Sequence, residues 1–300
     1  MTRIADLYEM ARDKKRFADL NAYIDFARRF IDFVVEPVNV SAVITSVNEH
    51  CYKFIQYKED AGYHITRPIN ADLFMKQGEK LTELTAFLAR GRGIAELAAD
   101  DRVLLNKIVY TLQQSVGCAL DALPAGAANA ARKVNGDLFE RLMLLVFRAL
   151  KFDVGSVVER VRDIPGATLT YQHDLAFKVR GELRLVGSVK TSSKDRIDKV
   201  FMDKLFYNRI RRVDIPHFAV FLNDVQRKKT KDERRGFGVS QTFMQGHFKA
   251  YSLAMTPLDG VYYCDLRPVM QTDPFLKREI KRLDQLICED IWQLIEAKAR

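Results

Sequence analysis

The feature that most constrains the fold is a pair of strand-like runs in the second half of the chain. One run spans residues 168–179 and the other 183–190, and the Arg-Gly-Glu sequence at 180–182 between them is typical of a β-hairpin turn. The pattern predicts a helix at 193–211, and residues 217–222 are apolar enough for a strand buried inside a sheet. This order predicts a mixed α/β fold, with a mixed central sheet flanked by helices.

The first part of the chain has a different pattern, in which apolar residues recur every three or four positions, for example across Val43–Ile55. We therefore expect a helical N-terminal domain at 1–122. Small residues dominate 123–133, which indicates a linker, and 134–300 would form the second domain. An amphipathic helix at 272–298 is expected to close the chain.

The composition points to a polyanionic partner and away from membranes. The net charge is +9, and residues 190–235 contain 14 Lys or Arg against seven Asp or Glu. No stretch reaches the roughly 18–20 apolar residues of a membrane span, and the N-terminus does not resemble a signal peptide. Four widely spaced cysteines form no CxxC pair, so we expect reduced thiols and a cytoplasmic protein.

The candidate chemistry lies on the predicted hairpin and on the helix after it. Asp174 lies within the first strand and Lys190 ends the second, which is the skeleton of a metal-dependent nuclease. Carboxylates hold Mg²⁺, which activates water for phosphodiester hydrolysis, and a lysine can position that water. A second acid is usual two residues before the lysine, but that residue is Ser188. Asp203 is the expected replacement, because it shares a helix face with Arg196 and Lys199.

This arrangement resembles the PD-(D/E)xK nuclease superfamily, and within it the CCGG family of type II restriction endonucleases, the branch with EcoRII and NgoMIV. In that branch the second acid lies on the helix and the strand reads Ser-x-Lys, as Ser188-Val189-Lys190 does. The branch also carries a basic–acidic–Arg triplet, here Lys194-Asp195-Arg196. Two positions depart from the pattern: His173 replaces the strand proline, and Asp203 stands where Glu is commoner.

The resemblance implies that the triplet reads the CC/GG half of a palindrome-like site. Arg and Lys can donate to guanine O6 and N7, and Asp can accept from cytosine N4. The alternative for Lys194, Asp195 and Arg196 is a solvated helix start capped by Ser192 or Ser193.

Further candidates lie outside the hairpin and its helix. The resemblance implies that an acid on the preceding helix approaches the metal; Glu140 is the candidate, and Asp137, its rival, is more simply a helix cap. Lys199 is a possible DNA contact. The segment 239–247 is a possible second recognition loop, in which Gln241, Gln245 or His247 would reach base edges.

The resulting hypothesis is a bacterial or archaeal type II restriction endonuclease. It would be a homodimer or larger homo-oligomer that uses Mg²⁺ to cut double-stranded DNA at a CC/GG-containing site, leaving 5′-phosphate ends. Asp174, Asp203 and Glu140 would hold metal beside Lys190, and the N-terminal domain would clamp DNA, read flanking bases or mediate association. The alternatives are a non-catalytic DNA-binding protein on a degenerate nuclease fold, and a repair or RNA-processing nuclease on the same fold.

Overall fold

The computed structural model describes residues 3–59, 62–122, 128–164, 166–194, 196–229 and 236–296. The chain forms two compact units that do not follow its order. The first unit comprises Met1–Ala86, Val103–Leu142 and Val225–Thr242. The second comprises Phe87–Arg102, Met143–Asp224 and Phe243–Arg300.

The second unit is built on a six-stranded mixed sheet in the order β12-β11-β8-β7-β6-β5. The strands are β5 (Asp153–Ile164), β6 (Ala167–Val179), β7 (Glu182–Ser192), β8 (His217–Asn223), β11 (Gly260–Tyr263) and β12 (Ile280–Arg282). The β5-β6-β7 pairs are antiparallel, and β8 joins β7 in parallel. Arg180 and Gly181, which turn the chain between β6 and β7, have φ of 54° and 84°, a region that glycine favours. The predicted hairpin, the buried strand at 217–222 and the mixed α/β fold are confirmed.

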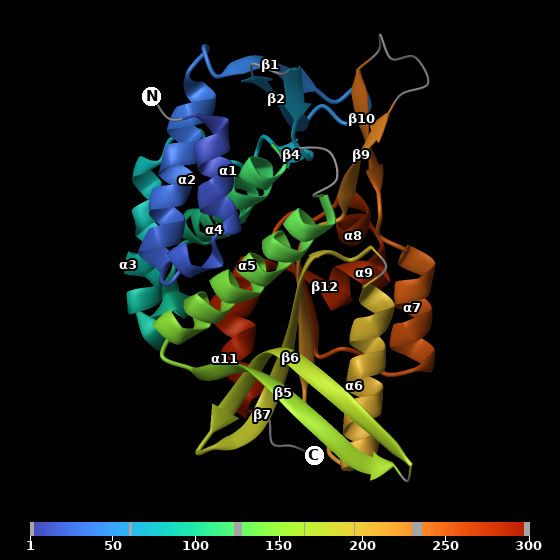
Figure 1. Ribbon diagram of the computed structural model, residues 1–300. Coiled ribbons are helices and arrows are strands. Elements are labelled where there is room, and N and C mark those ends of the chain that lie inside the picture. Colours follow the sequence, from blue (N-terminus) through green and yellow to red (C-terminus); the bar gives the residue numbers. More distant parts are fainter. Residues whose placement is uncertain are drawn as a thin grey trace. The chain divides into compact units, whose positions relative to one another are not determined.

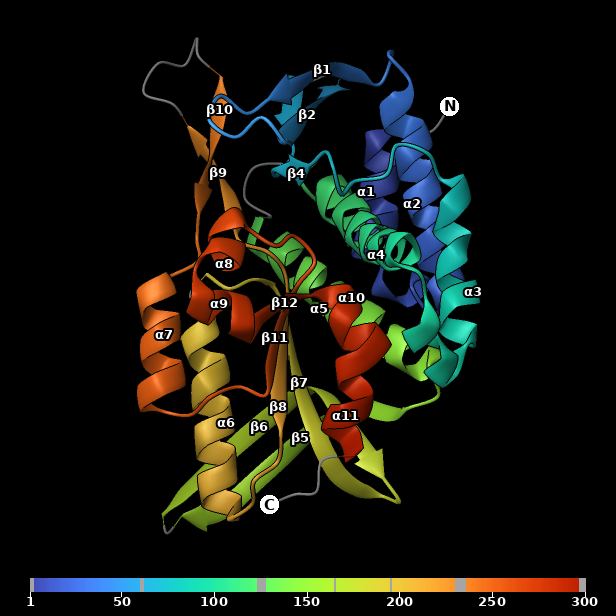
Figure 2. The same ribbon diagram turned by 180° about the vertical axis from the view of Figure 1, so that it is seen from behind.

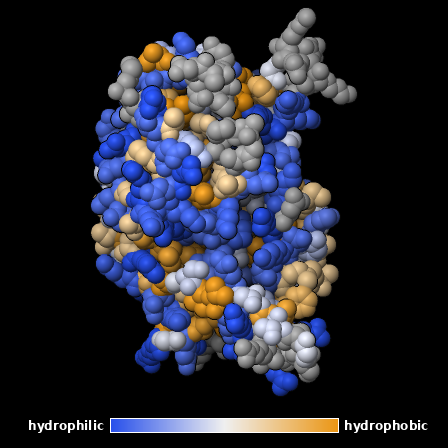
Figure 3. All heavy atoms as spheres, viewed as in Figure 1, coloured by the Kyte–Doolittle hydropathy of each residue, from blue (hydrophilic) through white to orange (hydrophobic). Residues whose placement is uncertain are grey.

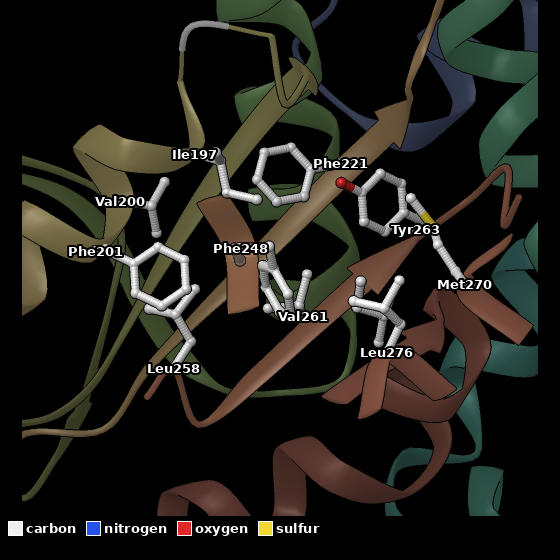
Figure 4. Packing of buried hydrophobic residues seen from close by; sticks show 12 residues of the cluster. Ile197, Val200, Phe201, Phe221, Phe248, Leu258, Val261, Tyr263, Met270 and Leu276 are labelled. Atoms are coloured by element: carbon white, nitrogen blue, oxygen red, sulfur yellow. The ribbon is translucent and has the colours of Figure 1, made fainter. Parts of the chain in front are cut away.

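Helices cover both faces of this sheet. On one face, α6 (Ile197–Arg211) and α7 (Gln245–Ala254) lie side by side (Figures 1 and 2). Their apolar side chains pack on β8 and β11 in one buried core (Figure 4): Ile197, Val200, Phe201, Ala219, Phe221, Phe248, Leu258, Val261, Tyr263, Met270, Leu276 and Ile280. On the other face Phe218 contacts Phe147 and Phe177, with ring centroids 6.1 and 5.9 Å away. β8 is therefore buried on both sides, which explains its continuous apolar run.

The remaining elements of the second unit are short. They are η3 (Gly91–Glu96), α8 (Pro268–Thr272), α9 (Pro274–Glu279), α10 (Leu283–Gln285), the π-helical η5 (Leu286–Asp290) and α11 (Ile291–Glu296). The single closing helix expected at 272–298 is wrong. Asp273 caps α9 by accepting from the Phe275 and Leu276 amides, and β12 then pairs with β11 and interrupts the helix.

The first unit combines helices with a small antiparallel sheet. Its helices are α1 (Ile4–Arg12), η1 (Lys14–Arg16), α2 (Leu20–Val35), η2 (Glu79–Thr82) and parts of α3 (Glu83–Ala89), α4 (Ala99–Leu120) and α5 (Ala128–Ala149). Its strands are β1 (Val40–Thr45), β2 (Tyr52–Glu59), β3 (Gly62–Ile65), β4 (Ile69–Asn70), β9 (Val225–Lys229) and β10 (Phe237–Gln241). The all-helical first domain is therefore wrong. The β-branched residues of β1 alternate between more and less exposed positions, as in a strand, and that period overrides the helical spacing.

The expected linker also differs from the structure. Residues 123–127 lie outside the described part of the chain, and α5 already begins at Ala128, so 128–133 are helical. Within the described residues, no helix is long and apolar enough to cross a bilayer. Hydrophilic residues cover most of the face drawn in Figure 3.

Candidate active site

Asp174 and Lys190 meet on the sheet face that α6 covers. Lys190 and Ser188 of β7 lie opposite Phe221 and Ala219 of β8, whose side chains belong to the core beneath α6. Asp174 Oδ2 accepts a hydrogen bond from the Val189 amide at 2.8 Å and one from Lys190 Nζ at 2.5 Å. The carboxylate is only 8% exposed, so this ion pair is shielded from solvent. The predicted acid–lysine pair is confirmed as a contact.

An irregularity in β6 directs Asp174 to this face. Between Gly155 and Val157, β5 advances two residues while β6 advances three, from Ala176 to His173. The extra residue in β6 therefore falls at Asp174–Leu175, and such bulges re-aim side chains beside active sites. As a result His173 packs against Tyr207 of α6, with ring centroids 4.8 Å apart, while its neighbour Asp174 reaches Lys190.

Asp203 approaches the same pair from α6. Burial raises the pKa of Asp203, the nearby charge of Asp174 raises it further, and Lys199 and Lys190 oppose that shift. Its carboxylate makes no hydrogen bond with any residue that the structure describes. Two carboxylates and one lysine thus share a site in which the second carboxylate has no hydrogen-bonding partner among the residues that the structure describes.

Ser188 lies two residues before Lys190 on β7, and its hydroxyl contacts His217 and not the acid–lysine pair. Ser188 Oγ lies 2.9 Å from His217 Nε2 in a hydrogen bond. Burial lowers the pKa of His217 to about 3, and the charges of His173, Lys204 and Lys190 act in the same direction, so the imidazole is neutral at pH 7. Ser188 is therefore a hydrogen-bonding partner of a neutral histidine and not a free hydroxyl.

The backbone of His217 continues this network. Asp259 Oδ2 accepts from the His217 amide and from Lys204 Nζ, each at 2.6 Å, and Lys204 Nζ also donates to the Pro257 carbonyl. The sequence analysis missed His217; its position at the start of a fully apolar strand was the one available indication.

His173 is the second histidine near this site. Burial lowers the pKa of His173, and its Nε2 is buried without a hydrogen-bond partner among the described residues.

The predicted recognition triplet lies at the start of α6. Lys194 and Arg196 are exposed, and Asp195 lies outside the described residues. Arg196 is the N-cap residue, so neither Ser192 nor Ser193 holds that position. The backbone just before the triplet is anchored by Asp224, which is fully buried and accepts from the Ser193 amide at 2.8 Å. Sequence reasoning missed Asp224, because nothing local marks a loop aspartate as an anchor for a segment 31 residues away.

The other predicted residues fall into three groups. Lys199 is exposed on α6 and acts on Asp203 through its charge. Gln245 donates to Asp273 from α7, and the exposed His247 is on the same helix, whereas the exposed Gln241 ends β10 in the first unit. Residues 239–241 end β10, 242–244 connect it to α7, and 245–247 begin that helix, so base contact by Gln241, Gln245 or His247 stays a prediction.

Glu140 and its rival belong to a different part of the chain. Glu140 is partly exposed on the stretch of α5 that belongs to the first unit, whereas Asp174 and Asp203 belong to the second, so its approach to metal stays a prediction. Asp137 lies in the middle of α5 and pairs with Lys14 at 2.8 Å; the expectation that it caps the helix is wrong.

The donor set of the site fits a hard divalent cation bound with few protein ligands. No group of three His, Cys, Asp or Glu residues that could hold a metal occurs in the described ranges. Mg²⁺ characteristically binds through one or two carboxylates and completes its octahedron with water and substrate phosphate. Asp174 and Asp203 could be those two ligands, since Asp203 has no hydrogen-bonding partner among the described residues.

The second unit thus has a mixed sheet flanked by helices, with an acid–lysine pair between the neighbouring strands β6 and β7. The structure is similar to the crystal structure of the type IIP restriction endonuclease Kpn2I, with a TM-score of 0.72, and the match covers 99% of each chain. Sequence identity is 17%, so the similarity establishes the fold. No family model and no curated protein matches the sequence.

Proposed function

We propose that this protein is a type II restriction endonuclease of the CCGG family that cleaves double-stranded DNA with Mg²⁺. The observation that carries the proposal is the position of Asp203, a half-buried carboxylate beside the Asp174–Lys190 pair with no hydrogen-bond partner among the described residues. Residues with raised pKa beside a charged partner are typical of functional sites. The fold shared with Kpn2I supports the same class of chemistry.

The residues divide the work of phosphodiester hydrolysis among them. Asp174 and Asp203 would hold Mg²⁺, with Glu140 as the predicted further acid, and the ion would polarise the phosphate and acidify its bound water. Lys190 Nζ, held by Asp174, would orient the attacking water and stabilise charge on the phosphorane-like transition state. Attack of the water oxygen on phosphorus would break the P–O3′ bond; the water would lose a proton and O3′ would gain one, which leaves a 5′-phosphate and a 3′-hydroxyl.

Sequence recognition is assigned to the exposed start of α6. Lys194 and Arg196 would donate to guanine O6 and N7, and Asp195 would accept from cytosine N4, in a CC/GG-containing palindrome-like site. Asp224 would hold this segment in place through the Ser193 amide. Gln241, Gln245, His247 and Lys199 remain possible DNA contacts. A palindromic site implies a homodimer or larger homo-oligomer with one active centre for each strand.

The test compares two aspartates of α6. Plasmid mixtures would be incubated with purified protein and Mg²⁺, and fragment ends sequenced, for the wild type, Asp203→Asn and Asp198→Asn. Asp198 is exposed on the same helix and is the matched control. Discrete fragments sharing a CC/GG motif are expected from the wild type and from Asp198→Asn. Asp203→Asn should cut at least about a thousandfold more slowly, because the metal loses a ligand, while still binding the site.

Other outcomes would select the alternatives. Specific binding by the wild type without cutting in any divalent metal would identify a non-catalytic DNA-binding protein. Cutting without a shared motif would indicate a repair-type nuclease and remove the recognition role of Lys194, Asp195 and Arg196. Unimpaired cutting by Asp203→Asn would refute the metal site itself.

A further inference from the structure

The β9–β10 ribbon is the part of the first unit in which its positive charge is concentrated. Residues 225–242 contain six Lys or Arg and two Asp or Glu, whereas the rest of that unit contains sixteen of each. The whole net charge of the unit therefore resides on a segment that the chain contributes after completing β8 of the other unit. A charge run that merely kept the unit soluble would not need this concentration.

The ribbon packs against the small sheet of the first unit. Val225 and Val239 are buried against Tyr52 and Phe54 of β2, and the three strands lie near one another in Figures 1 and 2. Asn48 clamps its edge: its side chain accepts from the Val239 amide at 2.9 Å and donates to the Val239 carbonyl at 2.8 Å. The backbone of the ribbon is thus held by the small sheet before any ligand arrives.

Three of its six basic residues, Lys231, Arg234 and Arg235, lie outside the described part of the chain, and the other three differ in their contacts. Arg227 Nη1 donates to the Ile65 carbonyl at 3.0 Å, and its guanidinium lies over the Phe237 ring, so Arg227 fastens the ribbon. The side chains of Lys228 and Lys229 are exposed, and neither ammonium group makes a hydrogen bond or ion pair with any described residue. Both ammonium groups are therefore available to a ligand.

The register places these two lysines on opposite faces. Lys229 pairs with Phe237 and Lys228 with Gly238, so their side chains alternate across the ribbon. A two-stranded ribbon fits the major groove of duplex DNA, where phosphates of the two strands flank it on both sides. A ribbon lying flat on one backbone would use only one of the two faces.

We propose that the β9–β10 ribbon enters a groove of double-stranded DNA and that Lys228 and Lys229 contact phosphates on its two sides. This contact is sequence-independent, so it supplies affinity and orientation rather than base readout. The inference rests on the proposed function for its ligand, but it assigns a surface in the first unit that the cleavage chemistry does not require.

The test measures how DNA binding depends on salt. Full-length wild type, Lys228→Ala, Lys229→Ala and the double variant would be titrated, without Mg²⁺, onto two labelled duplexes, one with and one without the cleavage site. The control is Lys76→Ala/Lys80→Ala, which removes two exposed lysines of the same unit. Each lost phosphate contact should reduce the slope of log K against log salt by about 1, and the double variant by about 2. Between about 50 and 200 mM salt, the wild type should then lose about tenfold more affinity than the double variant.

The expected result is an equal loss of affinity on both duplexes, with the control unchanged. An unchanged slope in the double variant, alongside normal cleavage by the wild type, would overturn the ribbon proposal alone. An effect of only one lysine would overturn groove entry, and a loss restricted to the specific duplex would make the ribbon a base reader. Failure of the wild type to bind either duplex would overturn both this inference and the proposed function.

Discussion

Two polar clusters lie on the same face of β7, two residues apart, and they differ in how completely the chain satisfies them. At Lys190, the second carboxylate of the cluster, Asp203, has a raised pKa and no hydrogen bond among the described residues. At Ser188, the hydroxyl meets His217, and Asp259 accepts from both the His217 amide and Lys204. The Lys190 cluster therefore has a carboxylate that could bind a ligand, whereas the groups of the Ser188 cluster hydrogen-bond to one another.

The difference teaches where to look for chemistry in a fold of this kind. A satisfied buried network stabilises one arrangement of the strands, while an unsatisfied carboxylate costs stability that function must justify. The proposed position of the second acid at residue 203 and not at residue 188 is consistent with this division. A carboxylate at 188 would lie in the pocket of a neutral histidine, whereas one on α6 faces Lys190 and Asp174.

The largest effect on cleavage is expected from removing the positive charge of Lys190. Lys190→Ala should slow single-turnover cleavage by about 10²–10⁴-fold, because the attacking water would lose the group proposed to orient it. Lys178→Ala, at an exposed position in the same hairpin, is the control and should cut normally. DNA binding, measured without metal, should be unchanged in both variants. A Lys190→Ala cleavage rate within tenfold of the wild-type rate would mean that the Lys190 cluster is not the catalytic site.

Changes at the Ser188 cluster should alter the stability of the fold and leave the cleavage rate unchanged. His217 stays neutral in the folded protein down to a pKa of about 3, whereas an unfolded histidine takes up a proton near about 6.5. The contribution of neutral His217 to the free energy of unfolding is therefore fully present above about pH 6.5. It is lost as the pH falls below that value, by at most about 1.4 kcal/mol per pH unit. His173, whose pKa is also lowered, adds to the loss in the same direction.

His217→Gln keeps a group that can bond Ser188 and removes the titration. Denaturant unfolding between about pH 7 and 5 should show a flatter pH dependence for this variant than for the wild type, by about 2 kcal/mol over the range. The exposed His50→Gln is the matched control. Parallel pH profiles for all three proteins would mean that His217 is not held neutral by the fold.

The sequence predicted the strands and the helix of the site better than the contacts between them. Alternating apolar residues and the turn at Gly181 were enough for the β6–β7 hairpin, and helical spacing placed Asp203 on a side of α6 where the charges of Asp174 and Lys190 act on it. Three features depend on partners far along the chain: the extra residue in β6, the Ser188–His217 contact across a parallel pair, and the Asn48 clamp on Val239, which spans 191 residues. Local patterns carry no information about such pairings.

The small sheet of the first unit shows a different kind of failure. The apolar spacing in Val43–Ile55 fits a helix and a strand about equally, and the predicted helix is wrong. What decides between them is the β-branched and aromatic content: β1 reads Val-Ser-Ala-Val-Ile-Thr, and Tyr52, Phe54 and Tyr57 of β2 are buried. Weighing residue shape together with period would have found these strands.

The smallest effect is expected at Ser188, and it separates the two clusters most sharply. Ser188→Ala removes the hydrogen bond to the buried His217 and should lower the free energy of unfolding by about 1–2 kcal/mol. Cleavage and its Mg²⁺ requirement should stay within about threefold of the wild type, because in the proposed site Asp203, and not residue 188, would supply the second metal ligand. Titration of the cleavage rate with Mg²⁺ measures this directly. A rise in the Mg²⁺ concentration needed for half-maximal rate, at unchanged stability, would mean that the hydroxyl belongs to the metal site and that the two clusters are one.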